Sequence, residues 1–236
     1  MFAVFAFAEV TFLGTSLLVL LPFVLGSPGL PADGPLPPVA LATALVVPTM
    51  LAALVAITGA ALVGRGSLRE RLGNQLALRW RSSDVGIGLA LGVASLLITL
   101  PAAMLWARWV GEGHANSAVG EVFDGQRLGL WIAITVFLGV WLVAPLCEEA
   151  LYRGVLWRAM EHWGWNRWVI FGLTTLVFSF AHLELLRTPL LVVISLPIAL
   201  ARMLTGNLVA SIVAHQANNF LPAVGLLLVS QGLLPT

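Results

Sequence analysis

The feature that most constrains this chain is a series of apolar runs, several of them long enough to cross a lipid bilayer as helices. A spanning helix needs roughly 17–25 predominantly apolar residues. We expect such helices at about 2–25, 39–63, 84–107 and 129–147, and shorter apolar helices at 168–184, 189–204, 207–220 and 221–233. The sequence therefore predicts an all-α fold, a polytopic transmembrane helical bundle of about 7–8 helices.

Composition agrees with a membrane protein and excludes several classes of function. Only 10% of the 236 residues are charged, against about 25% in soluble domains. The net charge of +1 comes without a basic patch, which argues against a nucleic-acid partner. The single cysteine, Cys147, excludes an intrachain disulfide framework and a cysteine-rich zinc site. The first ten residues lack a basic segment, so we interpret them as the start of a membrane helix and not as a cleaved signal peptide.

Arginines are distributed unevenly over the connections, which predicts the orientation in the membrane. The connection Ser27 to Pro38 has none, Gly64 to Ser83 has five, Arg108 to Leu128 has two, and the stretch from Glu149 to Arg167 has three. Cytoplasmic loops are enriched in basic residues, so we expect an integral, multi-pass protein with a cytoplasmic N-terminus. The compact length and the composition favour a bacterial cytoplasmic membrane.

Ionisable and amide side chains are concentrated in the second half of the chain. We therefore divide one continuous membrane domain into N-terminal transmembrane helices, 1–128, and a core that carries the chemistry, 129–236. Ionisable residues in membrane helices usually face the bundle interior and mark a pathway or a site. In the core the candidates are Glu148, Glu149, Arg153, His182, Glu184, Arg202, Asn207, His215, Asn218 and Asn219.

The two adjacent glutamates are expected to have different roles. Glu149 and Arg153 are four residues apart with the acid on the N-terminal side, which is the better order for an ion pair on a helix. Glu148 points about 100° away from Glu149, because a helix has 3.6 residues per turn. Arg153 can therefore hold Glu149 while Glu148 stays free.

The number of residues on each side of an expected turn predicts that Glu148 lies close to a histidine. A turn is expected at Gly164 to Asn166, between the helix that carries Glu148 and the one that carries His182. Residue 165 is the midpoint of this pair, so both lie about 25 Å along their helices from the turn. We expect Glu148 and His182 to meet.

These side chains can supply the parts of a hydrolytic site. A carboxylate beside an imidazole can hold a water molecule and take its proton as a general base. His215 and Asn219 share a helical face and offer one N–H donor each, and two donors aimed at one point can stabilise an oxyanion. Together these groups are sufficient to hydrolyse an amide bond.

Three motifs resemble those of a known family, the CPBP intramembrane proteases, which include the CAAX prenyl proteases and bacterial Abi or bacteriocin-processing proteins. They are E-E-x-x-x-R at Glu148, Glu149 and Arg153, F-x-x-x-H at Phe178 and His182, and H-x-x-x-N at His215 and Asn219. The resemblance covers about residues 129–233. It implies an endopeptidase that cuts a membrane-associated peptide or protein, with the lipid bilayer as its environment.

By this resemblance, each motif residue has an expected role. Glu148 activates water together with His182, His215 and Asn219 stabilise the oxyanion, and Glu149 and Arg153 orient the site. The family has been described both as metal-dependent and as glutamate proteases. Glu148, His182 and His215 are the three candidate ligands for zinc, but H-E-x-x-H is absent, and we favour a mechanism with no cofactor.

Other functions and more ordinary interpretations stay open. A proton-linked transporter predicts inverted repeats, and the sequence contains none that we can identify. A non-catalytic scaffold or immunity protein predicts the loss of a catalytic position, and none is lost. Several residues are expected to have no catalytic role: Phe178 and Cys147 as packing, His114 and His162 as surface residues, Glu184 and Arg187 as a solvated helix end, Asn218 off the His215 face, and Glu9 as an interfacial residue.

Overall fold

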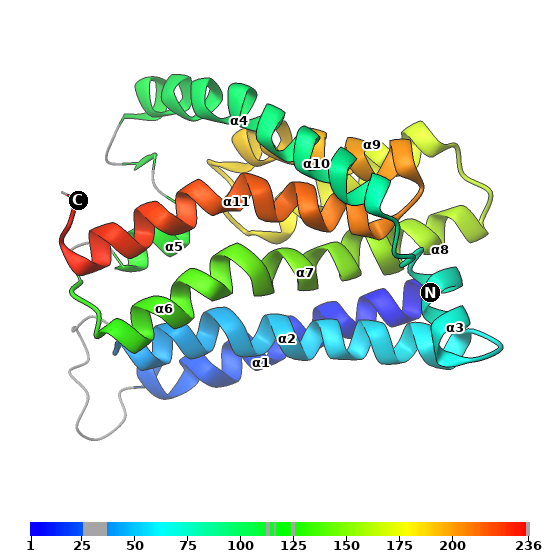
Figure 1. Cartoon of the computed structure of the whole chain (residues 1–236). Helices are drawn as coiled ribbons and strands as arrows, with labels where there is room; N and C mark the ends of the chain where they lie inside the picture. Colours follow the sequence, from blue (N-terminus) through cyan, green and yellow to red (C-terminus); the bar gives the residue numbers. More distant parts are fainter. Residues whose placement is uncertain (26–36, 112–113, 116, 124–125, 235–236) are drawn as a thin grey trace.

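The computed structural model describes residues 1–25, 37–111, 114–115, 117–123 and 126–234, and these form helices joined by turns (Figure 1). Six of the described helices are long and apolar enough to cross a membrane. They are α1 (Phe2–Val24), α2 (Pro38–Val63), α4 (Ser82–Val110), the continuous helix Leu130–His162, α10 (Thr188–Thr205) and α11 (Leu208–Gln231). The apolar helix α9 (Arg167–Ala181) is shorter. The prediction of an all-α, multi-pass membrane bundle is confirmed.

Two short helices, α3 (Leu68–Gln75) and α5 (Ala118–Phe123), lie in connections that were expected to be loops. A capping box fixes the start of α3, because the Ser67 hydroxyl accepts from the Glu70 backbone N–H and the Glu70 carboxylate accepts from the Ser67 backbone N–H. The Glu70 carboxylate accepts from both the backbone N–H and the hydroxyl of Ser67, and these two bonds hold the pKa of the exposed Glu70 carboxyl below its usual value. Residues 27–36 of the Pro/Gly connection lie outside the described residues.

The last two expected helices, 207–220 and 221–233, are one helix, so that prediction was wrong. α11 continues through Pro222 to Gln231. Proline removes a backbone donor, but membrane helices tolerate it where neighbouring groups satisfy the freed carbonyl. The helix expected at 129–147 continues to His162, just before the expected turn, and the other expected boundaries agree with the structure to within a few residues.

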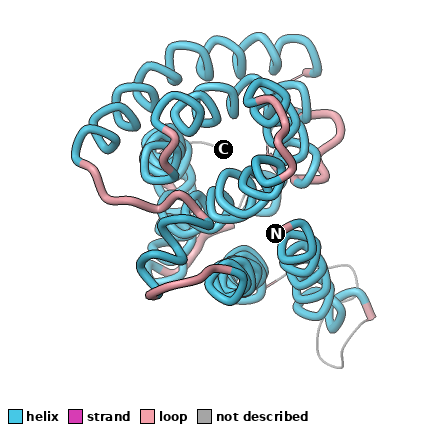
Figure 2. Tube along the Cα trace, turned by 90° about the vertical axis from the view of Figure 1, so that its right-hand side faces the viewer, coloured by secondary structure: helices cyan, strands magenta, loops and turns pink. Residues whose placement is uncertain are grey.

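Small residues let the helices approach closely. α4 packs along α11, and a Cβ added at Gly88 or Gly92 would come within 2.4 or 2.6 Å of the Ala210 and Ala214 carbonyl oxygens. This small-x-x-x-small spacing is the usual contact between membrane helices. α1 and α2 form the other closely packed pair in the bundle, which Figure 2 shows from the end where the N-terminus lies.

The helix Leu130–His162 contains two wide turns. It consists of α6 (Leu130–Leu138), the π-helix η2 (Gly139–Val143), α7 (Ala144–Glu149), the π-helix η3 (Ala150–Leu156) and α8 (Trp157–His162). η2 ends two residues before Pro145, whose ring cannot fit under the carbonyl four residues earlier and which has no N–H to donate. The two glutamates therefore lie on one and a half α-helical turns between two π segments, an arrangement often found at functional sites.

Candidate active site

Glu149 is the centre of a buried charged cluster. Its side chain is fully buried, and Oε1 accepts from Arg153 Nη1 at 3.0 Å and lies 3.1 Å from Nδ1 of His215. The expected ion pair between Glu149 and Arg153 is confirmed, although Arg153 lies in the π-helix η3. A buried carboxylate needs such partners because burying an unpaired charge costs several kcal/mol.

His215 connects both glutamates. It reaches them from α11, with Nδ1 toward Glu149 and Nε2 at 3.7 Å from Oε2 of Glu148. Its own side chain is 5% exposed, whereas that of Glu148 is 25% exposed. Glu148 is therefore the one carboxylate of the pair that a water molecule or a substrate can approach.

His182 lies just past the end of α9, with its ring turned back onto its own helix. Its Nδ1 lies 2.8 Å from the Phe178 carbonyl oxygen. Because a carbonyl can only accept, Nδ1 carries the proton, and the lone pair of Nε2 is left free to accept one. The half-buried His182 is thus in a tautomer that suits a base.

The expected direct meeting of Glu148 and His182 is not formed as an ion pair or hydrogen bond among the described residues. The midpoint argument assumed a uniform rise of about 1.5 Å per residue in both helices. The π-helix η3, between Glu148 and the turn, breaks that assumption, and α9 ends at Ala181 before it reaches His182. Glu148 instead faces His215.

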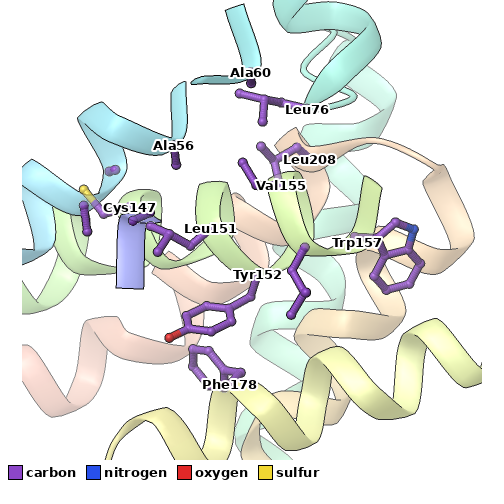
Figure 3. Packing of buried hydrophobic residues seen from close by; sticks show 14 of the residues in the cluster. Ala56, Ala60, Leu76, Cys147, Leu151, Tyr152, Val155, Trp157, Phe178 and Leu208 are labelled. Atoms are coloured by element: carbon purple, nitrogen blue, oxygen red, sulfur yellow. The ribbon is translucent and has the colours of Figure 1, made fainter. Parts of the chain in front are cut away.

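Phe178 is the residue that brings the two histidines into one cluster. Its ring centroid lies 4.7 Å from that of His182 and 5.7 Å from that of His215, both edge-on. The Arg153 guanidinium lies over the same ring, 4.3 Å from its centroid, which is a cation–π contact. Tyr152 packs against the ring edge-on, as Figure 3 shows. Phe178 does pack, as expected, but it also orders three site residues.

Asn219 faces the first π segment. Its Nδ2 donates to the Val140 carbonyl at 3.3 Å, and the neighbouring Gln216 donates to the Leu142 carbonyl at 3.4 Å. A π turn releases carbonyls from the regular ladder, so η2 can accept from α11 side chains. Asn218 has a different role, because its buried Oδ1 accepts from the hydroxyls of Ser95 and Thr99 on α4.

Glu9 is closer to the site than the sequence predicted. It lines a cavity of about 380 Å³ between α1 and α9, together with Phe5, Leu176, Val177, Phe180 and Ala181. Its carboxylate interacts electrostatically with Tyr152 and Glu148. The interpretation of Glu9 as simply interfacial missed this, although an acid in an apolar span is itself a signal.

Cys147, His114 and His162 lie where an ordinary interpretation puts them, but Glu184 and Arg187 are less exposed than the expected solvated helix end. Glu184 and Arg187 form an ion pair at 3.0 Å, with side chains 17% and 20% exposed. Cys147 is buried, and His114 and His162 are exposed. Asn207 and Arg202, which the sequence grouped with the site, lie instead at one end of the bundle.

A metal site is not built by the residues that were candidates for it. Within the described ranges, no three His, Cys, Asp or Glu side chains are placed to hold one ion. Among the described residues, Glu148, His182 and His215 are therefore not placed to bind one zinc ion together.

Comparison with known families gives one match. Residues 129–221 match the family described as "Rce1-like: Type II CAAX prenyl endopeptidase Rce1-like". Searches of curated proteins and of solved structures gave no match. The matched segment runs from the start of α6 into α11, and it contains the whole charged cluster and both histidines.

Proposed function

The chain carries an Rce1-like domain of the CAAX prenyl endopeptidase (CPBP) family over residues 129–221, and on that premise we propose that it is an intramembrane endopeptidase. The reaction is the hydrolysis of a peptide bond in a membrane-associated peptide or protein. The observation that carries the proposal is that His215 contacts two glutamates with different surroundings. One glutamate is fully buried and paired, and the next is partly exposed and faces the other ring nitrogen.

The first step is the activation of water by Glu148. Glu148 takes a proton from a water molecule held between it and the free Nε2 of His182, and the water oxygen attacks the carbonyl carbon of the substrate. General-base catalysis of this kind contributes about 10²–10⁴-fold to a rate. Support comes from the 25% exposure of the Glu148 side chain and from the His182 tautomer set by the Phe178 carbonyl.

The second step is the collapse of the tetrahedral intermediate. As the C–N bond breaks, the protonated Glu148 returns its proton to the leaving amine, so that Glu148 ends the cycle as a carboxylate. His215 Nε2 and Asn219 Nδ2 are the proposed donors to the oxyanion, for which fixed donors are usually a large catalytic term. His215 can donate there only when both of its nitrogens carry protons, and the Glu149 carboxylate supplies the compensating charge.

Glu149 and Arg153 have a positioning role in this mechanism. Both side chains are fully buried, so neither reaches the substrate. Glu149 fixes the plane of the His215 ring through Nδ1, and Arg153 holds Glu149 while stacking on Phe178. An imidazole ring that is hydrogen-bonded through one nitrogen keeps one orientation, so its second nitrogen can act as a base or a donor at a fixed place.

The substrate is expected to reach the site from the membrane. The cavity between α1 and α9 has mostly apolar walls and lies beside the cluster, so it suits an apolar part of a membrane-associated chain. The proposal needs a peptide bond and does not need a prenyl group. Orientation with the N-terminus in the cytoplasm is supported by the arginines of the α2–α4 connection, which lie at the N-terminal end of the bundle.

The test is cleavage of membrane-anchored peptides by the full chain in lipid vesicles, followed by mass spectrometry. The variants Glu148→Ala, His182→Ala and His215→Ala are compared with wild type and with Glu184→Ala. Glu184 is a matched control, because it is a helix-end acid near His182 whose ion pair lies outside the cluster. We expect cleavage by wild type and by Glu184→Ala, and none by the other three variants. Equal cleavage by wild type and Glu148→Ala would refute the mechanism.

A further inference from the structure

A second, polar cavity lies at the end of the bundle where the N-terminus is. It encloses about 210 Å³ between α3, α8 and the turn from α10 to α11. Its polar walls are Asn74, Arg79, Arg158, Glu161 and Arg202. None of the proposed catalytic residues lines it, so it is a separate site.

The charges around this cavity are unbalanced. Three guanidinium groups, those of Arg79, Arg158 and Arg202, face one carboxylate, that of Glu161. That carboxylate is already occupied, because Oε2 accepts from Arg158 at 3.0 Å and Oε1 accepts from the Trp157 indole at 2.8 Å. Two positive charges are therefore left for a ligand to neutralise.

Arg202 is the most unusual member of the group. It is 2% exposed, and in the described part of the chain no carboxylate lies within ion-pair distance of it. Its Nε donates to the Arg153 carbonyl at 3.0 Å, and its guanidinium lies 5.1 Å from the centroid of the Trp157 ring. A buried cation of this kind is costly without a counter-ion.

Hydrogen bonds from the start of α11 fix the backbone around Arg79. The Asn207 side chain accepts from the Arg79 N–H at 3.2 Å and donates to the Arg79 carbonyl and to Asp84. The Leu208 N–H donates to the Ala77 carbonyl at 3.0 Å. The Arg79 side chain itself is exposed and held to Asn74 Oδ1 at 3.1 Å. The cavity is thus a preformed site with one exposed arginine at its edge.

Exposed tryptophans place the cavity at the depth of the lipid headgroups. Trp80 follows Arg79 and is 80% exposed, and Trp163 and Trp168, beside the α8–α9 turn, are 71% and 58% exposed. Tryptophan is enriched at the boundary between lipid and water. The cavity therefore opens where the phosphate groups of phospholipids lie.

We propose that this cavity binds a phosphate group, supplied by an anionic phospholipid headgroup or by free phosphate. Arginine suits this ligand because its planar fork donates two parallel hydrogen bonds to phosphate oxygens. Basic cavities between membrane helices at headgroup depth bind anionic headgroups elsewhere. The Arg202–Arg153 hydrogen bond then connects the bound phosphate to η3, whose Arg153 pairs with Glu149 of α7.

Thermal unfolding of the delipidated full chain in neutral detergent tests the proposal without requiring any catalytic activity. The melting temperature is measured by tryptophan fluorescence. Added phosphatidylglycerol is compared with added phosphatidylcholine, and inorganic phosphate is compared with chloride at equal ionic strength. A ligand that binds the folded state raises the melting temperature according to its concentration and affinity. We compare wild type with Arg79→Gln, Arg158→Gln and the double variant, and use Arg69→Gln, an exposed arginine of the same end, as control.

We expect phosphatidylglycerol to stabilise wild type and Arg69→Gln more than phosphatidylcholine does, with binding about five-fold weaker for each cavity arginine removed. Stabilisation by inorganic phosphate at millimolar concentration that is lost in the same variants identifies free phosphate as a ligand. Stabilisation by phosphatidylglycerol alone identifies the headgroup. Equal effects of the two lipids without an effect of phosphate, or an unchanged response in Arg79→Gln, would overturn the proposal. If the double variant does not fold, the response of Arg79→Gln to phosphatidylglycerol decides the question.

Discussion

Removing Arg153 is the perturbation whose effect follows most directly from the structure. Arg153 and Glu149 are both fully buried and joined at 3.0 Å. Arg153→Met keeps an apolar chain of similar length over the Phe178 ring, but it removes the arginine that pairs with the Glu149 carboxylate and leaves His215 and Ser211 beside it. The variant therefore isolates the cost of a buried charge.

The expected loss of stability is large. Breaking a buried ion pair by removing one partner costs about 3–5 kcal/mol. For a chain of this size, that corresponds to a fall of roughly 6–20 °C in melting temperature. Two other nitrogens of Arg153, Nε and Nη2, are buried and have no partner in the described structure, so the pair is costly even when it is complete. Replacing both charges with neutral groups should therefore be much less harmful.

The assay is a double-mutant cycle measured by tryptophan fluorescence during thermal unfolding in one detergent. Its members are wild type, Arg153→Met, Glu149→Gln and the double variant, in which the glutamine oxygen can still accept from His215. We expect both single variants to lose about 3–5 kcal/mol and the double variant to be within about 1 kcal/mol of wild type. A double variant as unstable as the sum of the single ones would refute the reasoning, as would a stable Arg153→Met.

Three further predictions concern neighbouring features. Asn218→Ala leaves the Thr99 hydroxyl without its buried acceptor on α11, while the Ser95 hydroxyl keeps the Gly92 carbonyl; we expect a loss of about 1–3 kcal/mol in thermal unfolding and normal cleavage by the folded fraction. Treatment with EDTA should leave cleavage within about two-fold of its starting value, because the described donors do not form a metal site; loss of activity that zinc restores would contradict this. Val177→Trp should fill part of the cavity between α1 and α9 and raise KM several-fold with kcat little changed, and an unchanged KM would show that substrate does not use the cavity.

The local features of the fold and of the site could be predicted from the sequence. Length and apolarity alone located the membrane helices, because the bilayer sets both. The spacing of Glu149 and Arg153 predicted their ion pair, which depends only on helix geometry. The capping-box pattern S-x-x-E at Ser67 and Glu70 also predicts the start of α3, but this helix was not expected from the sequence.

The features that were missed depend on tertiary packing. The contact between Glu148 and His215 replaced the expected one with His182 because π-helix η3 changes the rise and the facing of the chain, and a π turn has no simple sequence signal. Glu9 approaches the site because α1 packs beside η3. The role of Phe178 as a platform for Arg153 and both histidines required three helices to converge.

The central claim is that Glu148 is the base and Glu149 is a positioning residue, and the most direct measurement compares Glu148→Gln with Glu149→Gln. For each variant, the cleavage rate of one membrane-anchored peptide is measured together with the melting temperature of the same preparation. The account predicts that Glu148→Gln keeps its melting temperature and loses about 10²–10⁴-fold in rate, whereas Glu149→Gln loses several degrees. Glu148→Gln that cleaves at the wild-type rate would contradict it.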